Sequence, residues 1–173
     1  MGRKIRMVPA NWDHPKSSND DRLQPMYDQN YERAATKWKA DFAAHDPSKC
    51  DGEEYWEYYG NPPEREYYRP WKDEDATWFQ LWETVSEGTP VSPPFATKEA
   101  LALYLAENGD FWDQKRCWNR GSCETFGMTY GEPGWGMDRA RAFVEAGWAP
   151  SMAIMDGEIL ASKDINLALK DKS

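Results

Sequence analysis

The chain has 173 residues and a formal net charge of -9, yet it contains 10 Trp, 9 Tyr and 6 Phe. Its mean hydropathy is -0.92, but the abundance of aromatic residues argues against wholesale disorder. The length suits one ordinary domain that buries roughly 70% of its unfolded surface. No apolar run approaches the roughly 20 residues that span a bilayer, so we expect a cytoplasmic protein without membrane contact.

The three cysteines, Cys50, Cys117 and Cys123, are an odd number and show no C-x-x-C spacing. This pattern is typical of reduced thiols rather than of a disulfide framework or a zinc site. The two histidines, His14 and His45, do not extend it into a metal-binding motif. The sequence therefore predicts neither a metal site nor a cofactor.

The negative charge is concentrated in residues 41–88. This segment holds thirteen acids against four bases, a difference equal to the whole net charge of the chain. A nucleic-acid-binding domain needs a positive surface to replace phosphate counterions. Direct binding of nucleic acid is therefore disfavoured.

Residues 1–27 are polar and interrupted by prolines, which predicts an extended N-terminal arm with little regular structure. A first helix is predicted at about 29–45, with Asp28 as its N-cap. Its apolar positions follow the helical period: Tyr31, Ala35, Trp38, Phe42 and His45. The aromatic and acidic run 53–59 that follows is compatible with a short strand or with a single helical turn.

Residues 77–85 are rich in aromatic and β-branched side chains, which favours a strand, although a helix would also group several of the apolar residues. Gly88 and the prolines at 90, 93 and 94 indicate an extended turn. Thr97 then caps a predicted helix at about 98–108, and Gly109 ends it.

The region 111–134 has no clear hydrophobic period. A third helix is predicted at about 137–146, followed by a β-hairpin at about 151–161 whose Asp156-Gly157 pair suits a type I′ turn. Ile165, Leu167 and Leu169 fit either a last strand or a frayed helix. We therefore expect a single α+β domain over 28–173, with a small antiparallel sheet and a core built from a few large rings rather than from many aliphatic side chains.

The sequence contains no nucleophile elbow, phosphate-binding loop, dinucleotide fingerprint or zinc-protease motif. Glu53, Glu54 and Glu57 could form a carboxylate site for acid/base chemistry, but clustered surface acids are commoner. Pro90 and Pro93 match the P-x-x-P pattern, although a rigid loop is the simpler interpretation. The sequence therefore predicts a binding protein rather than an enzyme.

The acidic, aromatic segment between 53 and 75 is the candidate interaction surface. Trp and Tyr are enriched in protein interfaces, and the acids would steer a positively charged partner. A sharper reading is imitation of a nucleic-acid backbone, whereas the simplest is that acidity keeps the chain soluble. The candidate residues are Glu53, Glu54, Tyr55, Trp56, Glu57, Tyr58, Glu64, Glu66, Tyr67, Tyr68, Trp71, Asp73, Glu74 and Asp75.

Three segments are distinctive when taken together: 6–15 (RMVPANWDHP), 83–93 (ETVSEGTPVSP) and 147–151 (GWAPS). With these the chain resembles a family of small proteins encoded by tailed bacteriophages and by prophages of Proteobacteria. The similarity runs over nearly the whole length but is weaker at 110–134, and it carries over no catalytic residues.

The resemblance implies a viral gene product in the bacterial cytoplasm or in the virion. The leading hypothesis is a non-enzymatic inhibitor that binds a host protein of defence or nucleic-acid handling. The alternatives are a virion structural or assembly protein, and a small enzyme with an unrecognised carboxylate site.

Overall fold

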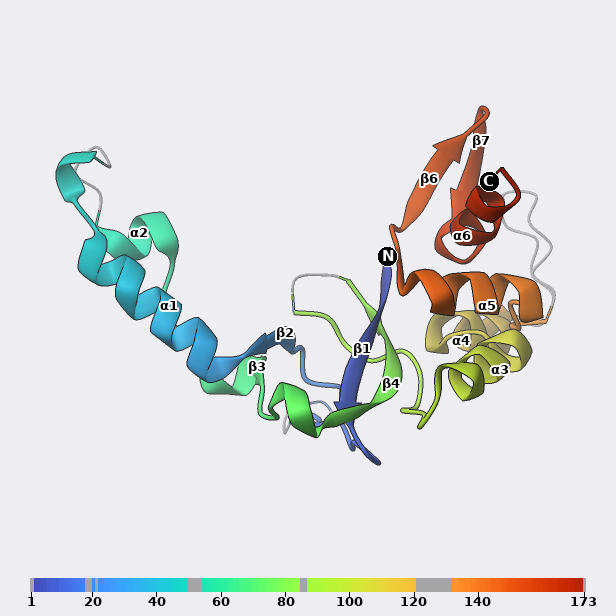
Figure 1. The fold of residues 1–173 in the computed structure, drawn as a ribbon, viewed down its shortest axis with the longest axis horizontal. Helices are drawn as coiled ribbons and strands as arrows, with labels where there is room; N and C mark the ends of the chain where they lie inside the picture. Colours follow the sequence, from blue (N-terminus) through green and yellow to red (C-terminus); the bar gives the residue numbers. More distant parts are fainter. Residues whose placement is uncertain are drawn as a thin grey trace.

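The computed structural model describes residues 2–17, 20, 22–49, 54–84, 87–120 and 132–172. The α+β class predicted from the sequence is confirmed. The protein has a body from which a long arm projects (Figure 1). The strands are β1 (Arg3–Pro9), β2 (Tyr27–Asn30), β3 (Tyr68–Arg69), β4 (Ala76–Glu83), β5 (Trp148–Ala149), β6 (Met152–Met155) and β7 (Glu158–Ala161). The α-helices are α1 (Tyr31–Ala44), α2 (Tyr55–Tyr59), α3 (Lys98–Asn108), α4 (Phe111–Arg120), α5 (Met137–Ala146) and α6 (Ser162–Lys170).

The first strand is the centre of the body's antiparallel sheet, whose order is β4-β1-β5. Arg3 pairs with Glu83 on one side and with Ala149 on the other. The prediction of an irregular arm over 1–27 is therefore wrong for residues 3–9. The sequence pattern did not predict this strand because charged residues normally indicate an exposed position, whereas Arg3 and Arg6 are both buried.

Strand β4 lies between two hydrophobic clusters, because its successive side chains point to opposite faces. Leu81 belongs to the cluster formed with α3 and α5, and Trp82 belongs to a second cluster with Val8 and Trp71. The second cluster is rich in rings, as the composition suggests. The first and larger one is mainly aliphatic, so the expectation of a core built from a few large rings is wrong there.

The segment after β4 folds back along it and leads into a capped helix, as predicted. Val91 donates its backbone N–H to the Leu81 carbonyl at 2.8 Å. The Thr97 side chain accepts the Ala100 N–H at 3.1 Å, and α3 spans Lys98–Asn108. This strand, turn and helix therefore follow from local sequence signals.

Helices α4, α5 and α6 cover the same face of the sheet as α3 (Figure 1). Helix α4 was not anticipated, and Asp110 begins it by accepting the N–H groups of Trp112 and Asp113 at 2.8 and 3.0 Å. Helix α5 has its predicted bounds. For the last segment, which fitted either a strand or a frayed helix, the structure has helix α6.

The predicted C-terminal hairpin is present as β6 and β7, with Asp156 and Gly157 at φ 52° and 84°. These left-handed values are those that a type I′ turn requires at both central residues. The outer face of the hairpin is apolar and open: Ile154 and Ile159 lie opposite each other and are 73% and 70% exposed.

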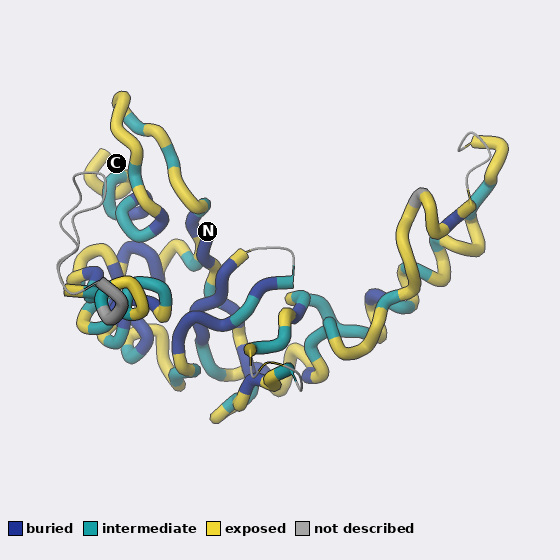
Figure 2. Tube along the Cα trace, turned by 180° about the vertical axis from the view of Figure 1, so that it is seen from behind, coloured by how far each residue is buried: buried dark blue, intermediate teal, exposed yellow. Residues whose placement is uncertain are grey.

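The projecting arm consists of residues 27–69, from β2 to β3. These two strands pair in parallel at its base, and α1 and α2 extend outward from them (Figure 1). Its residues are mostly exposed or half-buried (Figure 2). The N-cap of α1 is Asn30, which accepts the Glu32 N–H at 2.9 Å, rather than the predicted Asp28, which pairs with Lys4.

Within the described residues, no helix combines the length and the apolar character that crossing a membrane requires.

Candidate functional site: the projecting arm

The predicted interaction residues do not form one patch. They run from the far end of the arm, where α2 lies, back to the short 3-10 helix η3 (Asp73–Asp75) at the start of β4 (Figure 1). Glu53 lies outside the described residues, and so does the side chain of Tyr58. The arm therefore presents two separate surfaces, one at its tip and one at its base.

Two of the predicted anchors are buried and do not belong to any surface. Tyr55 is 2% exposed, and its hydroxyl donates to the Trp38 carbonyl at 3.3 Å. Trp71 is 6% exposed and packs against Trp12, with ring centroids 4.4 Å apart. The prediction is wrong for both, because an aromatic residue in a polar segment is as well suited to holding that segment on its neighbour as to binding a partner.

The tip of the arm exposes aromatic rings that have no place in the core. Phe42, Trp56 and Tyr59 are 46%, 51% and 51% exposed. Phe42 stacks on Trp38 at 5.2 Å between ring centroids, and Tyr59 stacks on the buried Tyr55 at 4.6 Å. We call Phe42, Trp56 and Tyr59 the tip cluster; such rings at the end of an arm match the anchors found in protein interfaces.

The acids beside the tip cluster hold α2 in shape. Glu57 accepts the backbone N–H of Glu54 at 3.1 Å, which satisfies one of the free donors at the start of this helix. Both side chains are exposed. Within the described part of the chain, neither carboxylate forms an ion pair with a basic residue. Both therefore add negative charge around the tip cluster.

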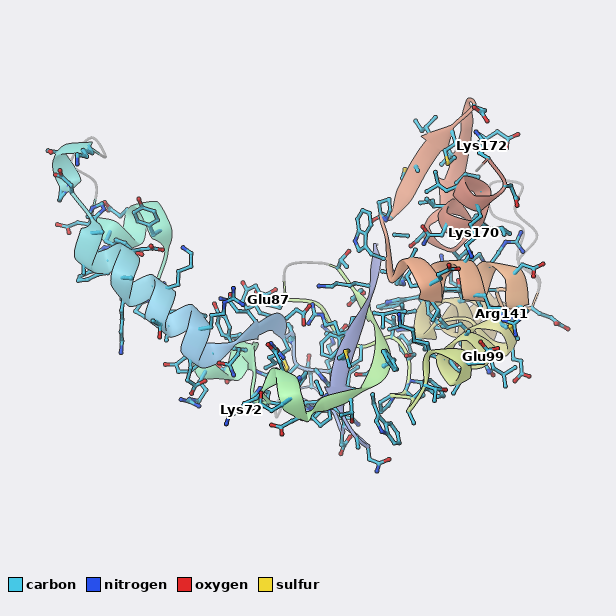
Figure 3. All side chains as sticks on the ribbon, viewed as in Figure 1. Lys72, Glu87, Glu99, Arg141, Lys170 and Lys172 are labelled. Atoms are coloured by element: carbon cyan, nitrogen blue, oxygen red, sulfur yellow. The ribbon has the colours of Figure 1, made fainter. Side chains whose placement is uncertain are left out.

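At the base of the arm, a pocket of about 190 Å³ opens between β2, β3 and the turn after β4. We call it the base pocket; Figure 3 shows Glu87 at this junction. Its lining residues are Tyr27, Asn61, Pro62, Pro63, Glu64, Tyr67, Tyr68 and Glu87. Sequence reasoning found Glu64, Tyr67 and Tyr68 but missed Tyr27 and Glu87, which are brought there by the fold from distant positions.

The base pocket combines aromatic faces with negative charge. Tyr27 donates its hydroxyl to Glu87 Oε1 at 3.1 Å, and its ring lies 5.0 Å from that of Tyr68. Burial raises the pKa of both tyrosines, and the negative charge of Glu87 raises each pKa further. Both hydroxyls therefore stay protonated beside a carboxylate.

The remaining predicted acids are Glu66 and the three of η3, and those of η3 are partly neutralised. Asp73 pairs with Arg69, and Glu74 lies 3.8 Å from Lys72. Glu66 and Asp75 are exposed. This small group therefore carries less free charge than its three consecutive acids suggest.

The buried charges of the body have a structural role. Arg3 donates to Asp110 at 2.6 Å, and Glu83 accepts from the Trp112 indole at 3.1 Å and from the Thr89 hydroxyl at 2.5 Å. These contacts link the sheet to α4. Among the described residues, no group of three or more His, Cys, Asp or Glu side chains is placed to hold a metal ion.

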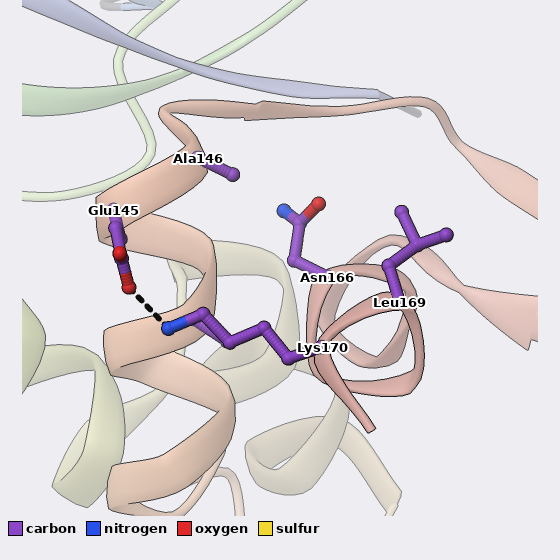
Figure 4. Close-up of a pocket in the computed structure, with 6 residues that line it drawn as sticks. Glu145, Ala146, Asn166, Leu169 and Lys170 are labelled. Carbon is purple, nitrogen blue, oxygen red and sulfur yellow. Dashed lines mark hydrogen bonds and ion pairs between the residues drawn. The ribbon is translucent and has the colours of Figure 1, made fainter. Parts of the chain in front are cut away.

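A larger cavity of about 290 Å³ lies between α5 and α6, but its charges neutralise each other. Glu145 and Lys170 form an ion pair across it (Figure 4). Lys170 lowers the pKa of Glu145 through this contact. The cavity therefore presents no unpaired charged group to a ligand among its lining residues.

Comparisons of the chain with protein-family models, with curated proteins and with solved structures found no match.

Proposed function

We propose that this chain is a phage-encoded, non-enzymatic binding protein that docks on a host protein through its arm and inhibits it. The target would be a component of bacterial defence or of nucleic-acid handling in the host cytoplasm, as the resemblance to phage proteins implies. The observation that carries the proposal is the arm, which exposes the tip cluster far from the body (Figure 1).

The physics of interfaces supports this use of the arm. A few aromatic anchors supply most of the binding free energy in many complexes, and exposed rings are therefore typical of such surfaces. The acids along the arm would attract a basic partner surface and speed its association. Phe42 and Tyr59 also pack on Trp38 and Tyr55, but about half of each residue stays exposed and is open to a partner.

The non-enzymatic part of the proposal is supported by how the acids are used. General acid/base chemistry requires carboxylates with separated pKa values in a cleft. The buried Glu83 and Asp110 are instead occupied with backbone, indole, hydroxyl and arginine donors. Glu54 and Glu57, which the sequence offered as a carboxylate site, lie exposed at the tip.

The test compares two tryptophans of nearly equal exposure. Trp56 at the tip is 51% exposed and Trp148 on the body is 52% exposed. Tagged wild-type protein, W56A and W148A are used for pull-downs from phage-infected cells, with quantitative mass spectrometry. We expect one host protein in stoichiometric amount with wild type and W148A, and its loss with W56A. Equal recovery by all three variants would refute docking through the tip.

A second candidate function, in virion assembly, is favoured by the hairpin. Met152, Ile154 and Ile159 leave one apolar face of β6 and β7 uncovered, and such faces mark contacts between proteins. This function predicts the protein in purified virions. Its absence there by mass spectrometry would exclude it.

A further inference from the structure

The base pocket is preformed by contacts that the arm shares with the body. Met26 donates its N–H to the Gly88 carbonyl at 2.9 Å. Arg6 donates to the carbonyls of Met26 and Glu87, at 2.7 and 2.8 Å. These bonds hold the neighbours Tyr27 and Glu87 in place, so a ligand would bind there without first ordering the site.

The size of the pocket restricts its ligand to a small group. Its volume of about 190 Å³ is below the range of roughly 300–1,000 Å³ that is typical of sites for whole cofactors and drug-sized molecules. A single side chain or a small ion-like group fits this space.

The chemistry of the lining selects a cation. Aromatic faces attract cations, and Tyr27, Tyr67 and Tyr68 line the pocket together with the carboxylates of Glu64 and Glu87. The Tyr27 hydroxyl occupies only Oε1 of Glu87. The second oxygen is therefore free of that bond and can accept from a ligand.

The neighbouring arginines do not neutralise these acids. Arg65 pairs with Glu32 at 3.0 Å, and Arg69 pairs with Asp73. Arg6 binds only the main-chain carbonyl of Glu87. In the described part of the chain, no ion pair involves either Glu64 or Glu87, so the pocket keeps its negative charge.

The arm already holds one cation by the same combination of groups. The Arg65 guanidinium lies 4.3 Å from the centre of the Tyr31 ring and pairs with Glu32. A tyrosine ring with a carboxylate beside it is also what the base pocket offers. The difference is that, within the described residues, no basic side chain lines the base pocket.

We infer that the base pocket binds a guanidinium or ammonium group, supplied by an arginine or lysine side chain of the partner protein. This inference rests on the proposed function for the identity of the partner, but the chemistry of the pocket does not depend on it. A free amine or free arginine shares the same chemistry, and the experiment separates the two sources.

The experiment titrates the intact protein, with ¹³C-labelled tyrosine, using a tetra-arginine peptide and, separately, free arginine at low ionic strength. Tyrosine ring signals are followed by NMR. We expect both probes to shift the signals of Tyr27 and Tyr68, and the affinity to fall at least tenfold in E87Q, because a charge-assisted hydrogen bond is lost. Tighter binding of the peptide than of free arginine, reduced in E87Q but not in D75N, identifies a protein-borne side chain, and equal binding identifies a free cation.

Two further variants serve as controls for this titration. E64Q changes an exposed side chain and should weaken binding without affecting the fold, whereas D75N changes an exposed acid outside the pocket and should leave the affinity unchanged. No shift with either probe, or equal affinities for wild type, E64Q and E87Q, would overturn the inference. If the cation site fails this test but W56A still loses the host protein in the pull-down, the proposed function stands and only the cation site is refuted. If the pocket binds cations but W56A keeps every partner, the cation site stands and docking through the tip is refuted.

Discussion

Replacing Tyr55 with Ala tests whether this residue supports the arm or binds a partner. Its ring is 2% exposed and lies 5.1 Å from those of Trp38 and Phe42 and 4.6 Å from that of Tyr59. Removing a buried aromatic side chain costs about 3–5 kcal/mol. Because α2 has five residues and so short a helix is unstable alone, we expect the loss to detach α2 from α1.

The assay is amide hydrogen exchange read by mass spectrometry. A loss of about 3 kcal/mol corresponds to roughly a hundredfold lower protection, which we expect in peptides from α1 and α2 and not in those from α3 and α5. The variant Y55F removes only the bond to the Trp38 carbonyl and should cost about 1 kcal/mol. If Y55A leaves exchange in the arm unchanged and abolishes partner binding, Tyr55 is an interface residue and the packing argument is refuted.

Three further predictions concern the body. D110A should lower the free energy of unfolding, measured in urea, by about 3–5 kcal/mol because it removes the carboxylate that pairs with the buried Arg3. D110N should cost less because its amide oxygen can still cap α4. Equal losses in the two variants would contradict this. His14 accepts from the Trp12 indole and its pKa is lowered, mainly by burial. The unfolded chain therefore binds this proton more tightly, so stability should fall as the pH drops below 6.5 and H14Q should flatten that part of the profile; an equally steep profile in H14Q would exclude His14 as the cause. G157A should lower stability by about 1 kcal/mol, seen in thermal melting, because φ is +84° although the space around it is open; an unchanged melting temperature would show that the turn relaxes.

Elements with complete local signals could be predicted from the sequence. Thr97 and Gly109 bound α3, and Asp156-Gly157 marks the hairpin turn. These residues act on backbone within one or two turns of their own position. Their effect is therefore visible without knowledge of the fold.

Elements that depend on distant partners could not be predicted. Strand β1 is hidden because Arg3 is stabilised by Asp110, over a hundred residues away. The same Asp110 caps α4, an amphipathic helix that could not be recognised because the longer segment 111–134 shows no clear period. The base pocket has the same origin, since Tyr27 and Glu87 are 60 residues apart in the chain and are brought together by the tertiary fold.

The structure also bears on how the acidic charge would act. Imitation of a nucleic-acid backbone needs closely and regularly spaced negative charges, as in DNA, where one occurs about every 1.7 Å along the axis. Here the acids of the candidate surface form no continuous row: Glu54 and Glu57 lie at the tip, Glu64 lines the base pocket, and Asp73 and Glu74 of η3 are paired with bases. This distribution favours docking by a few aromatic anchors, with the acids adding local recognition. Docking of that kind predicts a weak dependence of affinity on salt, whereas a steep one, comparable to that of DNA for the same target, would favour imitation.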